Sequence, residues 1–390
     1  MAINSTEDFS IVLGGPLYQF YLKTRLAKPP LYWFKRRVFA VTMFAWLPLL
    51  ILATFSGVAI SGVKVPFIFD IDTHARFIGS LALLVLAEVV THQRISVVIQ
   101  QFLQRDIITV ETRAKFDFYI ASALKLRNSV IVELLLLVAA VSCGHLLWQE
   151  YDFFNASTWY TTVINGNATL NLAGYWYVFI SLPIFQFILL RWYFRIFIWY
   201  KLLWQISRLP LQLNSLHPDR AGGLGFLTGS ISAFAAVLIA HTVLLAGMIT
   251  NRIWHYDATL LNFKEEILAL IGFLVALVLI PLVFFIFAMA RDKRIGTYKY
   301  GIMASHFVNL FYRKWVDNAA PGTSVLGAAD IQSLADLSNS FAATRDMNII
   351  PFSFKNVLQL VLLITLPILP LVFTLLPMLD IVRAVVKVFI

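Results

Sequence analysis

The sequence has little cysteine and little charge, and both shortages exclude classes of protein. Its single cysteine, Cys143, excludes an intrachain disulfide and a cysteine-rich metal site. Charged residues make up only 13% of the chain and hydrophobic residues 59%, which excludes an ordinary soluble globule. The chain also lacks an internal repeat of roughly 20 to 50 residues, so a solenoid or a repeat array is excluded.

Long hydrophobic runs take the place of these features. About 20 apolar residues in a helix cross a hydrocarbon core of roughly 30 Å. The first run begins at Val38, is too long for a signal sequence and follows a basic triplet, so we expect it to stay as an anchor. Prolines at 367, 370 and 377 should bend the last run. The runs predict an all-α bundle of seven membrane spans, over residues 38–62, 76–92, 129–148, 173–197, 226–250, 267–290 and 356–378.

Basic residues are concentrated in alternate connections between the predicted spans. Of the 31 lysines and arginines, 25 lie in residues 1–37, 93–128, 191–220 and 291–355. By the positive-inside rule these segments face the cytoplasm, the N-terminus included. We therefore expect contact with membrane lipids, including anionic lipids of the inner leaflet, and no nucleic-acid partner.

The predicted spans divide the chain into four parts. The 93–128 connector should form an amphipathic helix, because Ile95, Val98 and Phe102 share one face, and 198–225 should form a loop. The polar lobe should form two helices. Residues 1–37 should form a cytoplasmic interfacial segment and residues 38–290 a six-span membrane domain. Residues 291–355 should form a cytoplasmic helical lobe, and residues 356–390 the seventh span with its tail.

The most polar of the short connections contains the sequence HPDRAGGLGFL, which begins at His217 and leads into the fifth span. Gly222, Gly223 and Gly225 allow the backbone to approach a ligand or a neighbouring helix closely. Free backbone N–H groups beside Arg220 would bind an anion or a phosphate. A glycine-rich turn is also the simplest way to pack a loop between two spans, and both interpretations stay open.

Ionisable residues occur at one depth within three of the predicted spans. They are Glu88, Glu133, Arg191 and Arg195. A charge in an apolar span costs several kcal/mol unless it is paired or hydrated, so such charges mark a pathway or a site. The two arginines are four residues apart and share a helix face, which favours pairing with the two glutamates. The alternative is that the arginines snorkel to the inner head groups.

Other candidate ligands are too few for a metal ion or a cofactor. His241 lies near the middle of the fifth span, where an imidazole can relay protons or hydrogen-bond a neighbour. Haem would need a second axial histidine, and His145 is only roughly level with it. Asp70, Asp72 and His74 lie close together but supply too few ligands alone. The sequence therefore predicts neither a metal site nor a cofactor.

The combination of PFIFDIDTHARF, FQFILLRWYFRIFIW, HPDRAGGLGFL and ADIQSLADLSNSF resembles a family of bacterial polytopic inner-membrane proteins with no assigned activity. The resemblance runs from Phe9 to about Leu379. It implies a stand-alone, multi-pass protein of a bacterial inner membrane. It supplies no substrate, cofactor or catalytic residue.

A channel or transporter for a small anion is the leading functional hypothesis. The basic residues of the fourth span and of the loop would line its cytoplasmic mouth, balanced by Glu88 or Glu133. Charges at one depth and a glycine-rich break in the helices motivate this hypothesis.

Two other classes remain open. One is an enzyme of the membrane interface acting on a phosphorylated lipid or lipid-linked substrate. In it His217 is general acid or nucleophile, Asp219 its orienting partner and Arg220 the phosphate clamp. The other is a non-catalytic scaffold whose lobe recruits a cytoplasmic partner. Small residues along the fifth span also allow a homo-oligomer.

Overall fold

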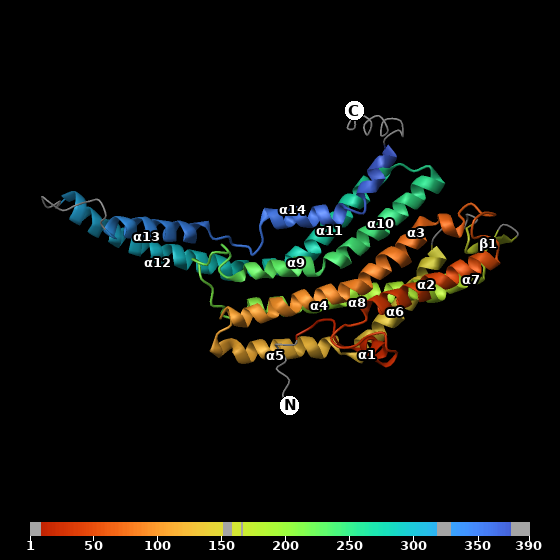
Figure 1. Cartoon of the computed structure of the whole chain (residues 1–390), viewed down its shortest axis with the longest axis horizontal. Helices are drawn as coiled ribbons and strands as arrows, with labels where there is room; N and C mark the ends of the chain where they lie inside the picture. Colours follow the sequence, from red (N-terminus) through yellow and green to blue (C-terminus); the bar gives the residue numbers. More distant parts are fainter. Residues whose placement is uncertain (1–8, 151–157, 165–166, 318–328, 376–390) are drawn as a thin grey trace.

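The protein is helical almost throughout, as predicted, and the strands in its described part form one antiparallel hairpin (Figure 1). The hairpin pairs β1 (Thr161–Ile164) with β2 (Asn167–Leu170). The structure is a computed structural model, and it describes residues 9–150, 158–164, 167–317 and 329–375.

Five helical stretches of the described chain are long and apolar enough to cross a membrane, as in an integral membrane protein. They are Phe34–Phe55, Ile71–Gln104, Leu172–Ser207, Leu224–Tyr256 and Leu260–Val283. The first stretch is α2 (Phe34–Phe55), and the second contains α3 (Ile71–His74) and α4 (Leu81–Gln104). The third contains α7 (Leu172–Trp176) and α8 (Leu182–Ser207). The fourth contains α9 (Gly229–Ala233) and α10 (Ala235–Tyr256), and the fifth contains α11 (Lys264–Val283).

Of the other two predicted spans, one is a continuous helix and one is bent. The third predicted span is α6 (Val130–Glu150), and its apolar stretch, taken over the residues whose side chains are described, is Val130–Ser142. The seventh is α14 (Phe354–Thr365) followed by a helical turn at Leu369–Leu375, and the two axes differ by 61°. Pro367 lies within the break, where it cannot supply a helix hydrogen bond. The described part therefore has five candidate spans, or six if the bent pair counts as one.

The connector after the second span is two helices rather than one. Helix α4 continues to Gln104, and the chain turns with Asp106 in the left-handed region at φ 54°. Helix α5 (Val110–Arg127) then runs back below α4 in the view of Figure 1. Ile95 and Phe102 are fully buried, so the apolar face predicted for this stretch is confirmed. It belongs to the last turns of α4, which extends well beyond the end predicted for its span.

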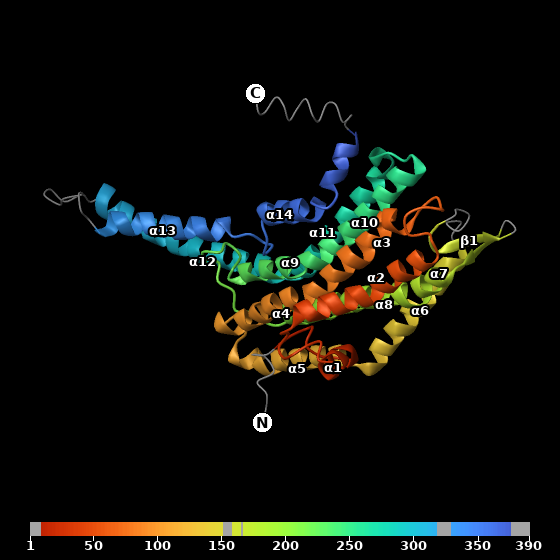
Figure 2. The same cartoon turned by 45° about the vertical axis from the view of Figure 1, so that its right-hand side comes forward.

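The first described residues pack into the core instead of lying only on a surface. Residues 9–15 are not helical, and Phe9, Ile11 and Val12 are at most 1% exposed. Helix α1 (Pro16–Lys23) follows, and it lies beside α5 near the start of α6 (Figure 2). Chain from the N-terminal part of the protein therefore covers the bundle beside α5 and the start of α6.

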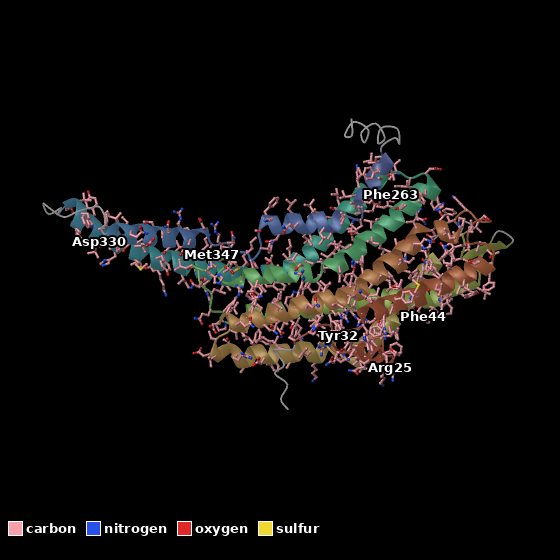
Figure 3. All side chains as sticks on the ribbon, in the orientation of Figure 1. Arg25, Tyr32, Phe44, Phe263, Asp330 and Met347 are labelled. Carbon is pink, nitrogen blue, oxygen red and sulfur yellow. The ribbon has the colours of Figure 1, made fainter. Side chains whose placement is uncertain are left out.

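Two helices form an arm that projects from the bundle. Helix α12 (Ile286–Tyr312) follows α11 after a break at 284–285, and α13 (Ala329–Asp346) returns along it. Figure 3 shows Asp330 towards the far end of the arm and Met347 at its root. The two helices expected in the polar lobe are present, although α12 is longer than a small surface helix.

Candidate functional site

Glu88 lies at the centre of a buried group of charges. Its Oε1 accepts a hydrogen bond from Nη2 of Arg195 at 2.8 Å, and its Oε2 lies 3.1 Å from Nη2 of Arg37. Nη1 of Arg191 lies 3.8 Å from Oε1. Three guanidinium groups therefore surround one carboxylate, and they come from α2 and α8 while the glutamate comes from α4.

Periodicity explains why the two arginines of α8 point inwards. Ile188, Trp192 and Trp199 are buried and recur at helical spacing along α8. Arg191 and Arg195 lie on the same stripe and are 7% and 4% exposed. Because this stripe faces the bundle, the two side chains cannot extend to lipid head groups, and the snorkelling alternative fails for both of them.

Glu133 forms the second half of the site. Its Oε1 lies 3.0 Å from Nε of Arg191 and accepts a hydrogen bond from the backbone N–H of Leu17 at 3.1 Å. The glutamate thus links the start of α6 to α8 and also holds the first turn of α1. The structure brings together all four charges that the sequence predicted to pair.

Arg37 belongs to this site and was missed from the sequence. It is 0% exposed, and its Nε and Nη1 have no hydrogen-bond acceptor among the described residues. Its guanidinium lies 5.4 Å from the ring centre of Tyr21. Arg37 is the third residue of a basic triplet, and the sequence predicts that this triplet is a flank that orients the first span. No local pattern distinguishes it from such a flank; the structure shows that α2 begins at Phe34, which places this arginine inside the helix.

Arg127, at the end of α5, is the fourth arginine and was also missed. Its Nη1 donates to the carbonyl of Ser10, and its Nε donates to Oδ1 of Asn128 at 3.0 Å. Burial, together with the positive charge of Arg195, lowers the pKa of Arg127 to about 10. The side chain still carries its charge at neutral pH.

The resulting arginine cluster, as we call it, holds more positive than negative charge. It consists of Arg37, Arg127, Arg191, Arg195, Glu88 and Glu133. With both glutamates ionised, four guanidinium groups face two carboxylates. A cavity of about 10 Å³ lies against it, lined by three of the arginines, Glu133, Gly14, Ser129 and apolar side chains. That volume is near the minimum for one water molecule or one ion of similar size.

The glycine-rich loop is closed around Asp219 rather than open to a ligand. Its carboxylate accepts hydrogen bonds from the backbone N–H groups of Ala221, Gly223 and Gly225, at 2.8, 3.1 and 2.9 Å. Burial alone would raise the pKa of Asp219, but these three donors and the nearby imidazole of His217 hold it below its usual value. We expected free N–H groups here, and these three are used by the chain's own carboxylate.

The loop is held together internally and is also attached to the root of the arm. Within the loop, Nδ1 of His217 lies 2.9 Å from Oδ1 of Asp219. At the root of the arm, the N–H of Asn348 donates a hydrogen bond to the carbonyl of Arg220 at 2.7 Å. The Arg220 side chain is exposed. Gly222 has φ 65°, and a Cβ atom there would lie 2.7 Å from Cε of Met347. Among the residues that the structure describes, no hydrogen bond or ion pair connects this loop to the arginine cluster.

The remaining candidates have partners within the protein. The two ring nitrogens of His241 lie 2.7 Å from the Val237 carbonyl and 2.7 Å from the Tyr193 hydroxyl. The side chain of His145 lies outside the described part. Asp70 accepts hydrogen bonds from Thr73 and Trp159, and Nδ1 of His74 accepts one from Trp46, while Asp72 pairs with Arg76.

Comparisons of the chain with protein-family models, with curated proteins and with solved structures find no match. The arginine cluster is the feature whose chemistry is most specific, because it joins buried charge and a cavity lined by three of its arginines, and because Arg37, which does not line that cavity, has unused hydrogen-bond donors.

Proposed function

We propose that the protein is a channel or transporter for a small anion, and that the anion binds at the arginine cluster. The observation that carries the proposal is the imbalance of four guanidinium groups, those of Arg37, Arg191 and Arg195 buried and that of Arg127 half-buried, against two buried carboxylates. An uncompensated charge at this depth costs several kcal/mol. An anion offsets that cost at the place where it arises.

The magnitude of the attraction supports this assignment. Two unit charges 4 Å apart interact by about 4 kcal/mol at an effective dielectric constant of about 20. An anion that touches two guanidinium groups therefore gains enough to offset a substantial part of its own desolvation. The unused Nε and Nη1 donors of Arg37 add to the demand for an acceptor at the cluster.

The two glutamates favour transport over permanent binding. Each carboxylate is already hydrogen-bonded or ion-paired to the arginines that an anion would use. An arriving anion must compete with a carboxylate for the same donors, so it binds and also leaves. Conduction needs this balance of attraction and release.

In this proposal the basic segments face the cytoplasm of a bacterial inner membrane and contact its anionic lipids, and the arginine cluster lies inside the bundle near that side. An interface enzyme has less support, because Asp219 occupies the N–H groups that a phosphate would need.

A second candidate function is recruitment of a partner by the arm. Tyr298 and Ile302, one turn apart on α12, are 70% and 55% exposed. Such a stripe fits another protein or a second copy of this chain.

Chloride efflux from liposomes tests the transport proposal. The purified protein is reconstituted, and efflux is compared for the wild type, Arg191→Gln and a matched control, Arg113→Gln. Arg113 lies on the exposed face of α5 and pairs with Asp117. We expect the wild type and the control to release chloride at similar rates and Arg191→Gln to release it much more slowly. Equal rates in all three proteins, or no efflux above that of empty liposomes, would sink the proposal.

A further inference from the structure

The segment from Phe9 to Gly15 closes the arginine cluster although it forms no regular structure. Phe9 and Ser10 are 0% exposed, and Gly14 forms part of the cavity wall. A non-helical segment usually lies on the surface, where water satisfies its backbone. Here it lies between the end of α5 and the start of α6, directly over the charges.

Few polar contacts with the rest of the protein hold this segment in place. Arg127 donates to the carbonyl of Ser10, and the N–H of Gly15 donates to Oδ1 of Asn128 at 3.2 Å. Just after the segment, the N–H of Leu17 in α1 donates to Glu133. Arg127 and Glu133 are charged members of the cluster. A ligand that draws Arg127 away from Ser10 weakens the attachment of the segment, and one that draws Glu133 away from Leu17 loosens its junction with α1.

We infer that the segment Phe9–Gly15 is a lid over the arginine cluster, and that the space it closes holds one monatomic anion of halide size. The inference rests on the proposed function and names both its ligand class and its gate. The cavity of about 10 Å³ has room for one water-sized particle, so a polyatomic anion does not fit while the lid is closed. In this inference the anion enters when the lid lifts.

A buried reporter cysteine measures lid opening without relying on flux. Ile198 is 1% exposed and lines the cavity, so Ile198→Cys reacts with a thiol reagent only when the lid is open. The natural Cys143 is replaced by alanine to remove the background reaction. Labelling is followed in the full-length protein in proteoliposomes, in sodium chloride and in sodium gluconate of equal concentration.

Two variants open the lid and one serves as their control. A Cβ atom at Gly14 would lie 2.1 Å from Oδ1 of Asn128 and 2.5 Å from Nε of Arg127, so Gly14→Val must displace either the lid or the two side chains that hold it. Asn128→Ala removes the acceptor of the Gly15 N–H and is the milder change. A Cβ atom at Gly272 in α11 would meet nothing within 4 Å, which makes Gly272→Val the matched control.

We expect Gly14→Val to label about tenfold faster than the control, with Asn128→Ala in between, because access follows the opening equilibrium. We also expect chloride to slow labelling relative to gluconate. If both variants label at the control rate, the segment is not a lid. If labelling is faster but is equally fast in chloride and in gluconate, the site does not bind a halide.

Efflux from the same proteoliposomes separates this inference from the proposed function. If Arg191→Gln loses efflux while labelling in Gly14→Val is unchanged, the lid is rejected and the transport proposal stands. If Arg191→Gln keeps its efflux while Gly14→Val labels faster and chloride protects it, transport through the cluster is rejected and the lid over a halide site stands.

Discussion

Arg195 and Glu88 form the shortest ion pair of the arginine cluster, with Nη2 of the arginine 2.8 Å from Oε1 of the glutamate. The same carboxylate also lies close to Arg37 and Arg191. One glutamate thus holds three helices together through charge. Removing the charge of Glu88 should therefore destabilise the folded protein, and an anion bound beside the arginines should restore part of that stability.

Glu88→Gln should lower the free energy of unfolding by about 3–5 kcal/mol, because it leaves three buried guanidinium groups without their shared carboxylate. Thermal unfolding in detergent measures the loss, with Glu111→Gln on the exposed start of α5 as the control. Chloride should restore more stability to Glu88→Gln than gluconate does. A variant as stable as the control would show that the pairs are not formed.

Asp219→Asn should destabilise the loop at neutral pH, since an amide has one acceptor oxygen for the three N–H donors that the carboxylate receives. The pKa of Asp219 is lower in the folded than in the unfolded chain, whose aspartates titrate near about 3.9. The wild type therefore has this stabilisation above about pH 4 and loses it as the pH falls through the folded pKa. As the pH falls from about 4 through the folded pKa, the unfolding curves of wild type and variant should converge, whereas Asp336→Asn on the exposed face of α13 should leave the pH dependence unchanged. Parallel curves for Asp219→Asn would contradict the role of this carboxylate.

Gly296→Val should detach the arm from the bundle, because a Cβ atom at this position would lie 2.1 Å from Oγ of Ser215. Hydrogen exchange should become faster at the root of α12 and in the 214–225 loop, while the spans stay protected. Gly272→Val is again the control without a clash. Unchanged exchange in the loop would mean that the arm and the loop are not in contact.

Tyr193→Phe removes the hydroxyl that lies 2.7 Å from Nε2 of His241. Leaving this buried nitrogen without a partner should cost about 1–3 kcal/mol of stability. Because both ring nitrogens have partners in the folded protein, we expect chloride efflux to stay at the wild-type rate. Tyr298→Phe, at a position 70% exposed, is the control. A loss of efflux without a loss of stability would show that His241 acts in transport.

The helices and the charge pairs could be predicted because each depends on a strong local signal. Apolar runs long enough to cross a membrane define the spans, and four ionisable residues within them have few ways to be satisfied except by meeting. The four-residue separation of Arg191 and Arg195 also fixes their common face.

The remaining features depend on contacts that no local pattern encodes. Arg37 and Arg127 lie in basic segments whose composition is typical of solvated flanks, and only tertiary packing buries them. The loop glycines fit a ligand and a carboxylate equally well, and the side chain of Asp219 decided between the two. The lid forms because Arg127 at the end of α5 and Asn128 directly after it hydrogen-bond to the lid backbone.

Anomalous scattering from bromide tests the central claim, that an anion completes the arginine cluster, most directly. Crystals grown in sodium bromide are measured at the bromine absorption edge. The account predicts a peak in the cavity beside Arg127, Arg191 and Arg195, which disappears in Arg191→Gln crystals. Bromide found only on exposed basic side chains, with the cavity empty, would contradict the account.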